Sequence, residues 1–121
     1  MDWARKDLLD IESLSPTEIQ TLLDCARYFK KVCLSPRKYA PFLQGYTVAN
    51  FFVEPSTRTR TSFELAAKHL GATVVNLSAE SSSLKKGETL KDTVLNLEAL
   101  QTDVLVMRHS ASGAPQFVAE R

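Results

Sequence analysis

The fold is decided by residues 46–77, which read YTVANFFVEPSTRTRTSFELAAKHLGATVVNL. The first eight, 46–53, are rich in β-branched and aromatic types and predict a strand, and their nearly continuous apolar character is typical of a strand covered on both faces. Residues 61–70 predict a helix that ends at Gly71, and 72–77 predict a second strand. A strand, a helix and a strand in this order predict parallel pairing of the two strands.

The same alternation extends to both sides of this unit. Upstream, Ser15-Pro16-Thr17-Glu18 has the pattern of a capping box with proline at the first helical position. Apolar residues then recur at helical spacing up to Phe29, and Pro36 stops the pattern. Downstream, we expect a helix at 89–100, a third strand at 103–107 and the start of a helix at 115–121.

This order predicts an α/β fold, a three-layer αβα arrangement around a parallel sheet. In the helix at 61–70, the residues expected to face the core are Phe63, Ala66, Ala67 and Leu70. Three strands are few for such a sheet, and 121 residues fall short of one average domain, so we expect an incomplete domain.

Three polar segments follow the three predicted strands, at 54–60, 78–88 and 108–113. The carboxyl ends of parallel strands meet at one edge of the sheet, which is where α/β folds bind ligands. We therefore expect these segments to share one site.

The segment at 55–61 reads PSTRTRT and lies between a buried strand and a helix. A helix N-terminus offers unpaired N–H groups and a positive dipole end, which suit an anion. Hydroxyls and two guanidinium groups add donors matched to phosphate or carboxylate. Nothing here has the glycine pattern of a nucleotide loop, which favours a compact phosphate. The alternative is a capped helix start with two solvated arginines.

Residues 51–64, FFVEPSTRTRTSFE, resemble the carbamoyl-phosphate signature of the aspartate/ornithine carbamoyltransferase family. The resemblance implies that Ser56, Thr57, Arg58 and Thr59 hold the phosphate. It also implies that Arg58 stabilises charge on the leaving oxygen and that Thr59 helps to position the carbonyl group. By the same resemblance Arg60 is structural and pairs with a carboxylate. Apart from the resemblance, Glu64 is expected to be a structural partner of a nearby arginine.

Residues 82–93, SSLKKGETLKDT, are similar to the mobile loop of aspartate carbamoyltransferases, which enters the active site of a neighbouring subunit. Counting back from the glycine, the resemblance assigns functional roles to Lys86 and Ser82. Lys85 is a weaker candidate, and Ser83 is an alignment alternative to Ser82. The resemblance implies a homotrimer with shared active sites, and it leaves room for a regulatory or non-catalytic chain. The alternative is a solvated surface loop.

Arg108 is expected at the carboxyl end of the third strand, on the edge where the site is predicted. By the resemblance it contacts the carbonyl oxygen and the phosphate of carbamoyl phosphate, so the implied catalytic set is Arg58, Thr59, Lys86 and Arg108. The alternative is an arginine that only caps the strand end. His109 is expected to have no catalytic role, because the family's histidine belongs to a His-Pro-x-Gln segment further along.

The resemblance implies that residues 1–121 are the N-terminal part of the carbamoyl-phosphate-binding domain, without the amino-acid-binding domain. The implied reaction transfers a carbamoyl group from carbamoyl phosphate to L-aspartate, giving N-carbamoyl-L-aspartate and phosphate in pyrimidine biosynthesis. The segments KKGETLKDT and MRH favour aspartate over ornithine as the acceptor. Two alternatives remain, an ornithine carbamoyltransferase and a non-catalytic phosphate-binding or assembly subunit.

Composition excludes several other classes. Lys plus Arg number 15 against 14 Asp plus Glu, and this balance gives no case for nucleic-acid binding. No apolar run approaches a membrane span, and the N-terminus lacks the order of a signal peptide. Two cysteines make no disulfide framework, so a cytoplasmic location is expected. No cluster of ligating residues predicts a metal, and no cofactor is expected.

Overall fold

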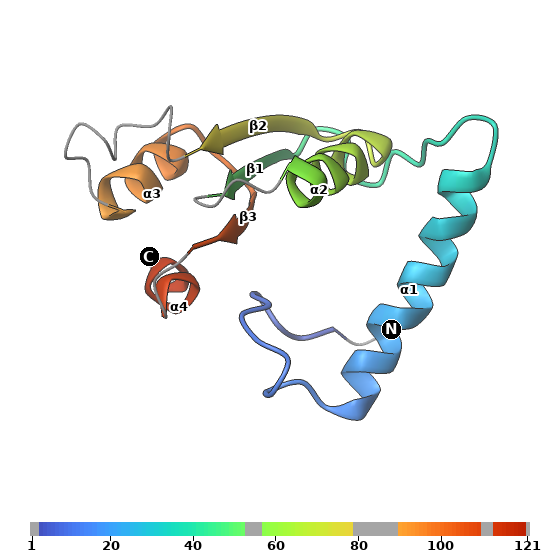
Figure 1. Ribbon diagram of the computed structural model, residues 1–121, viewed down its shortest axis with the longest axis horizontal. Helices are drawn as coiled ribbons and strands as arrows, with labels where there is room; N and C mark the ends of the chain where they lie inside the picture. Colours follow the sequence, from blue (N-terminus) through green and yellow to red (C-terminus); the bar gives the residue numbers. More distant parts are fainter. Residues whose placement is uncertain (1–2, 53–56, 79–89, 110–112, 121) are drawn as a thin grey trace. The chain divides into compact units, whose positions relative to one another are not determined.

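The computed structural model describes residues 3–52, 57–78, 90–109 and 113–120. The chain divides into two compact units, Met1–Lys38 and Tyr39–Arg121. Figure 1 shows the elements, which in chain order are α1 (Pro16–Leu34), β1 (Thr47–Phe52), α2 (Thr57–His69), β2 (Thr73–Ser78), α3 (Leu90–Ala99), β3 (Val104–Arg108) and α4 (Ala114–Ala119).

Helix α1 of the first unit begins with the predicted capping box. The Ser15 hydroxyl accepts from the Glu18 N–H at 3.1 Å, and the Glu18 carboxylate accepts from the Ser15 N–H at 2.9 Å. After Leu34, the Ser35 hydroxyl donates to the carbonyl of Val32 at 2.6 Å. Within the described residues no side chain of α1 is buried, and Leu23, on the predicted apolar face, is 50% exposed.

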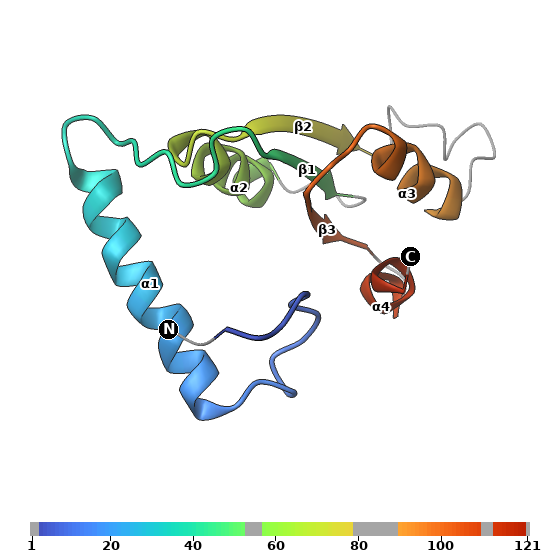
Figure 2. The ribbon, with the colours of Figure 1, turned by 180° about the vertical axis from the view of Figure 1, so that it is seen from behind.

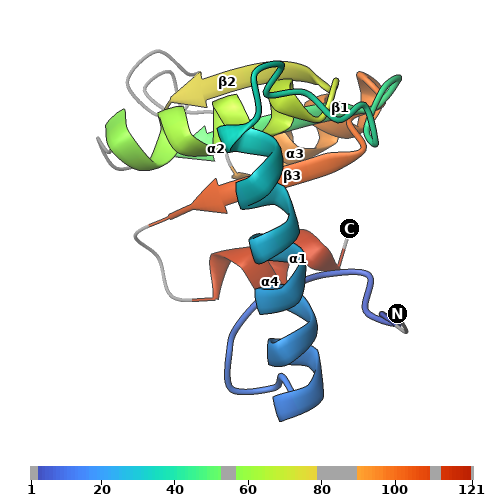
Figure 3. The same ribbon diagram turned by 90° about the vertical axis from the view of Figure 1, so that its right-hand side faces the viewer.

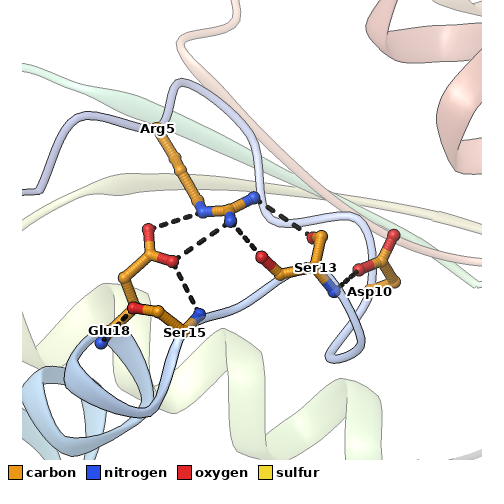
Figure 4. A network of polar contacts seen from close by, with 5 residues as sticks. All are labelled: Arg5, Asp10, Ser13, Ser15 and Glu18. Carbon is orange, nitrogen blue, oxygen red and sulfur yellow. Dashed lines mark hydrogen bonds and ion pairs between the residues drawn. The ribbon is translucent and has the colours of Figure 1, made fainter.

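An arginine ties the segment before α1 to the start of that helix (Figure 4). The Arg5 guanidinium donates to both carboxylate oxygens of Glu18, through Nε at 2.6 Å and through Nη2 at 3.1 Å. It also donates to the Ser13 hydroxyl at 3.1 Å and to the Ser13 carbonyl. Asp10 accepts from the Ser13 N–H at 2.8 Å. Glu18 therefore takes part both in the helix cap and in a bidentate ion pair with Arg5.

This ion pair makes the first unit sensitive to acid. Hydrogen bonds from Arg5, followed by the one from the Ser15 N–H, lower the pKa of Glu18 from 4.5 to about 2. Because the folded pKa lies below the unfolded one, the stabilisation is complete above about pH 4.5 and is lost as the pH falls toward 2. Fluorescence of Trp3 should follow this loosening over that range. Glu18→Gln should flatten the pH dependence, and an unchanged profile in that variant would contradict the assignment to Glu18.

The second unit is built on a parallel sheet with the strand order β2-β1-β3, visible from both sides in Figures 1 and 2. The last residue of β1, Phe52, is level with Ser78 on β2 and with Arg108 on β3. The predicted α/β architecture with a parallel sheet and flanking helices is confirmed.

The middle strand β1 forms the core of this unit. All its residues from Val48 to Phe52 are buried, and alternate side chains of a strand point to opposite faces, so both faces of β1 are covered. Helix α2 packs on the face that carries Phe52, where the rings of Phe52 and Phe63 lie 6.3 Å apart, centroid to centroid. The predicted character of this strand is confirmed.

The main difference from expectation concerns α2. It begins at Thr57 rather than at residue 61, so the hydroxyl- and arginine-rich segment forms its first turn instead of a preceding loop. Of the residues expected to face the core, Ala67 is buried, but Phe63 is 44% exposed. The helix ends at His69, and the expected terminating glycine follows at Gly71, whose φ of +83° requires glycine or a strained residue.

Candidate functional site

The predicted convergence of three chain segments follows from the register of the sheet. Phe52, Ser78 and Arg108 end their strands and are register partners, so the chain leaves all three strands at one edge. The predicted site residues Ser56, Ser82 and Lys86 lie outside the described residues. Thr57, Arg58, Thr59 and Arg108 are described, and they lie at or next to this edge.

The first turn of α2 consists of residues 57–60 and faces that edge. Figure 3 shows α2 running opposite to the strands, with its first turn on the side to which the arrows of β2 and β3 point. The first four N–H groups of a helix have no acceptor within the helix, so this turn presents donors to the edge. Thr57 and Arg58 are exposed, while Thr59 and Arg60 are half-buried.

The charges of this turn oppose the usual preference of a helix start. The positive end of the helix dipole favours acidic side chains, and α1 accordingly has Glu18 in its first turn. Helix α2 has no acidic residue there and instead has Arg58 and Arg60. Two cations at a positive dipole end repel each other and the dipole unless an anion lies between them. The exposure of Arg58 also fits a solvated arginine, but the charge balance favours an anion site.

Arg108 adds a third guanidinium on the same side of the sheet. Register partners on parallel strands point to the same face, so Arg108 shares the face of Phe52, on which α2 packs. Its side chain is exposed at the end of β3. The first turn of α2 and Arg108 therefore lie on the same face of the sheet, at its carboxyl edge.

Glu64, one turn beyond Arg60, does not have the predicted arginine as its direct partner. Its carboxylate accepts from the Lys68 ammonium at 2.8 Å and from the Asn76 side-chain amide at 2.7 Å. These contacts lower the pKa of Glu64, the Lys68 hydrogen bond most and that of Asn76 next, while Arg60 contributes only through its charge. The pairing follows the i,i+4 spacing of Glu64 and Lys68.

Sequence reasoning missed a polar contact within the sheet. The Asn50 side chain is fully buried, and its Nδ2 donates to Oδ1 of Asn76 at 3.2 Å. Oδ1 of Asn50 accepts no hydrogen bond from any described residue. The available signal was an asparagine inside an otherwise apolar buried strand.

Two other kinds of feature, a metal centre and a membrane span, have no support in the part of the chain that the structure describes. Within the described ranges, no three His, Cys, Asp or Glu side chains gather as a metal ion would require. In the same ranges, none of the helices has the length and apolar character needed to cross a bilayer.

Residues 6–121 match the family described as aspartate/ornithine carbamoyltransferase, carbamoyl-P binding domain. The chain belongs to this family. It is 55% identical over 119 residues to the aspartate carbamoyltransferase catalytic subunit of Syntrophus aciditrophicus and 54% identical over 121 residues to that of Syntrophotalea carbinolica. These alignments cover 98% and 100% of the chain but 39% of each relative, so the chain spans about two fifths of their length.

Solved structures of the family have the same fold. The catalytic subunit of M. jannaschii aspartate transcarbamoylase is 38% identical with a TM-score of 0.83, covering 96% of this chain and 38% of that one. Aspartate transcarbamoylase from Trypanosoma cruzi, in complex with carbamoyl phosphate and aspartate, is 37% identical with a TM-score of 0.78, covering 90% and 33%. The resemblance in the sequence is confirmed for family and fold.

The starts of α1 and α2 allow an internally controlled test of anion binding. Titration of the ¹⁵N-labelled chain with inorganic phosphate should shift the amide signals of residues 57–60, because their N–H groups face the predicted site. The amide signals of Ser15 and Glu18 should stay in place, because the capping box already occupies them. Equal shifts at both helix starts would contradict a built anion site at α2.

Proposed function

We propose that this chain is the carbamoyl-phosphate-binding part of an aspartate carbamoyltransferase catalytic subunit. The observation that carries the proposal is the shared carboxyl edge, where the cationic first turn of α2 and Arg108 lie on the same face of the sheet. The names of the relatives and the Trypanosoma cruzi complex support carbamoyl phosphate as the anion and aspartate as the acceptor.

The proposed residue roles follow from the charges that develop in carbamoyl transfer. The aspartate amine attacks the carbonyl carbon, a C–N bond forms, the C–O bond to phosphate breaks, and one amine proton is transferred to the departing phosphate. Negative charge grows on the carbonyl oxygen and then on the departing phosphate, so donors fixed at both positions lower the barrier. Ser56, Thr57, Arg58 and Thr59 would hold the phosphate, and Arg58 would also stabilise the leaving oxygen. Thr59 and Arg108 would position and polarise the carbonyl group.

The remaining roles depend on residues that the structure does not describe and on the part of the relatives that lies beyond the aligned region. We propose that Lys86 and Ser82 reach the active site of a neighbouring subunit in a homotrimer, where a lysine ammonium can close over a dianion. We assign residues 1–121 to the carbamoyl-phosphate-binding domain and aspartate recognition to a separate amino-acid-binding domain. A cytoplasmic location fits the absence of a disulfide framework.

Two alternatives are weaker. An ornithine carbamoyltransferase would share the Ser-Thr-Arg-Thr-Arg segment, but the relatives from Syntrophus and Syntrophotalea are aspartate enzymes. A non-catalytic phosphate-binding or assembly subunit would keep the fold without the reaction, and the presence of Arg58, Lys86 and Arg108 argues against it.

A chimera tests whether the chain supplies catalytic residues. Residues 1–121 replace the matching part of the Syntrophus aciditrophicus subunit, and carbamoyl-aspartate formation is measured. The chimera should be active, and Arg58→Ala should raise its activation barrier by about 3 kcal/mol or more, because it removes charge stabilisation in the transition state. Arg37→Ala, in an exposed segment far from the edge in sequence, is the matched control.

Two outcomes of this assay would contradict the proposal. Near-normal turnover with Arg58→Ala would refute the role of that residue. A folded chimera that binds phosphate but transfers no carbamoyl group would favour the non-catalytic subunit.

A mixing experiment tests the shared sites. Lys86→Gln and Arg58→Ala chimeras should each be nearly inactive alone. Mixed after dissociation and reassociation, they should regain activity, because a hybrid trimer contains a site with Arg58 from one chain and Lys86 from another. If no mixing ratio restores activity above the sum of the separate variants, each subunit works alone.

A further inference from the structure

We propose that Asn50, Asn76 and Glu64 form a polar chain that positions α2 on the sheet, and with it the first turn that holds the anion. The inference deepens the proposed function, because it depends on that function for the identity of the anion. The three residues come from β1, β2 and α2, so the polar chain links the middle of the sheet to the helix.

The Glu64 carboxylate, at one end of the polar chain, fixes the direction of both hydrogen bonds in it. An ionised carboxylate can only accept, and contacts with Lys68 and Asn76 keep the pKa of Glu64 low. Asn76 must therefore turn its amide nitrogen to Glu64, at 2.7 Å, and its oxygen to Asn50. Asn50 in turn must donate through Nδ2, at 3.2 Å. The three side chains therefore have one compatible arrangement.

The burial of Asn50 indicates a role other than stability. Its side chain is 0% exposed in a strand whose other buried residues are apolar, and its Oδ1 accepts from no described residue. Burying an amide with one unpaired acceptor costs free energy that a valine at this position would not. A buried polar side chain of this kind is expected where it specifies one packing arrangement among several that apolar contacts would allow.

Apolar packing leaves the placement of α2 open. Ala67 is the one residue of this helix that is buried, and Phe63 is 44% exposed. The far end of α2 is held through its last carbonyls, since the N–H groups of Ala40 and Leu43 donate to His69 and Leu70, each at 2.8 Å. The half of the helix nearest the anion lacks such backbone contacts in the described residues. There the ring contact of Phe63 with Phe52 and the polar chain through Glu64 link the helix to the sheet.

The polar chain lies close to the edge that it would control. Glu64 follows Arg58 by six residues, about 9 Å along a helix axis at 1.5 Å per residue. Asn50 precedes the end of β1 by two residues, about 7 Å at 3.3 Å per residue. A shift or tilt of α2 permitted by loss of this link would move the first turn relative to Arg108.

The test uses the 121-residue chain, inorganic phosphate as the probe, and two readouts. The first is the dissociation constant of phosphate, followed through the amide signals of residues 57–60. The second needs no ligand and is the nuclear Overhauser contact between the rings of Phe52 and Phe63, which reports where α2 lies on β1. Asn76→Val, which keeps a strand-forming side chain, should weaken phosphate binding on the order of fivefold and should change the ring contact.

Two conservative variants separate positioning from general stability. Glu64→Gln keeps an acceptor for Asn76 and should bind phosphate within about twofold of the original chain. Lys68→Gln removes the exposed ion pair but keeps the link to Asn76, and it should also stay within about twofold. Glu64→Met removes the acceptor from the helix surface and should reproduce both effects of Asn76→Val.

The outcomes distinguish failure of the positioning role from failure of the proposed function. If Asn76→Val or Glu64→Met is folded by circular dichroism and leaves both readouts unchanged, the positioning role is refuted. If Asn76→Val fails to fold, Glu64→Met alone tests the positioning role. If the original chain binds no phosphate but the ring contact changes in Glu64→Met and not in Lys68→Gln, the proposed function fails while the positioning role stands.

Discussion

The register of the parallel sheet fixes the position of the carboxyl end of β1 relative to those of β2 and β3. Phe52 is level with Ser78 and Arg108, and that register brings three chain segments to one edge. A slip of one residue would turn Arg108 to the opposite face of the sheet, away from α2. The burial of β1 on both faces enforces the register, because a slip would also misplace its apolar side chains. The site therefore depends on the packing of a strand that contributes no described site residue.

The second constraint is electrostatic, and the two helix starts illustrate it. Helix α1 begins with a capping box and Glu18, which is what a stable helix start requires. Helix α2 begins with two arginines and no acidic residue, which weakens it in the absence of an anion. The buried Asn50 with an unpaired oxygen is a second feature that stability alone does not explain. Both departures occur where α2 meets the sheet, and the anion that we propose at its first turn accounts for the two arginines.

Periodicity and turn chemistry were sufficient to predict the capping box of α1, the three parallel strands and the glycine that ends α2. The start of α2 was placed too late because residues 57–60 are hydroxyl and arginine types without the usual acidic signal. The nearby arginine expected for Glu64 acts only through its charge, and the hydrogen bond of Glu64 with Lys68 was missed although the i,i+4 spacing offered the signal. The contact of Asn50 with Asn76 could not be predicted, because it exists only once the register places two distant asparagines on one face. The order of strands and loops along the sequence was enough to predict which segments meet at one edge of the sheet. Which side chains pair with each other depends on the strand register, which only the three-dimensional structure gives.

The measurement that bears most directly on this account is a crystal structure of the chain grown with phosphate. We predict one phosphate at the carboxyl edge, hydrogen-bonded to N–H groups of residues 57–60 and within reach of both Arg58 and Arg108. A phosphate bound elsewhere, or Arg108 on the face of the sheet opposite to α2, would contradict it.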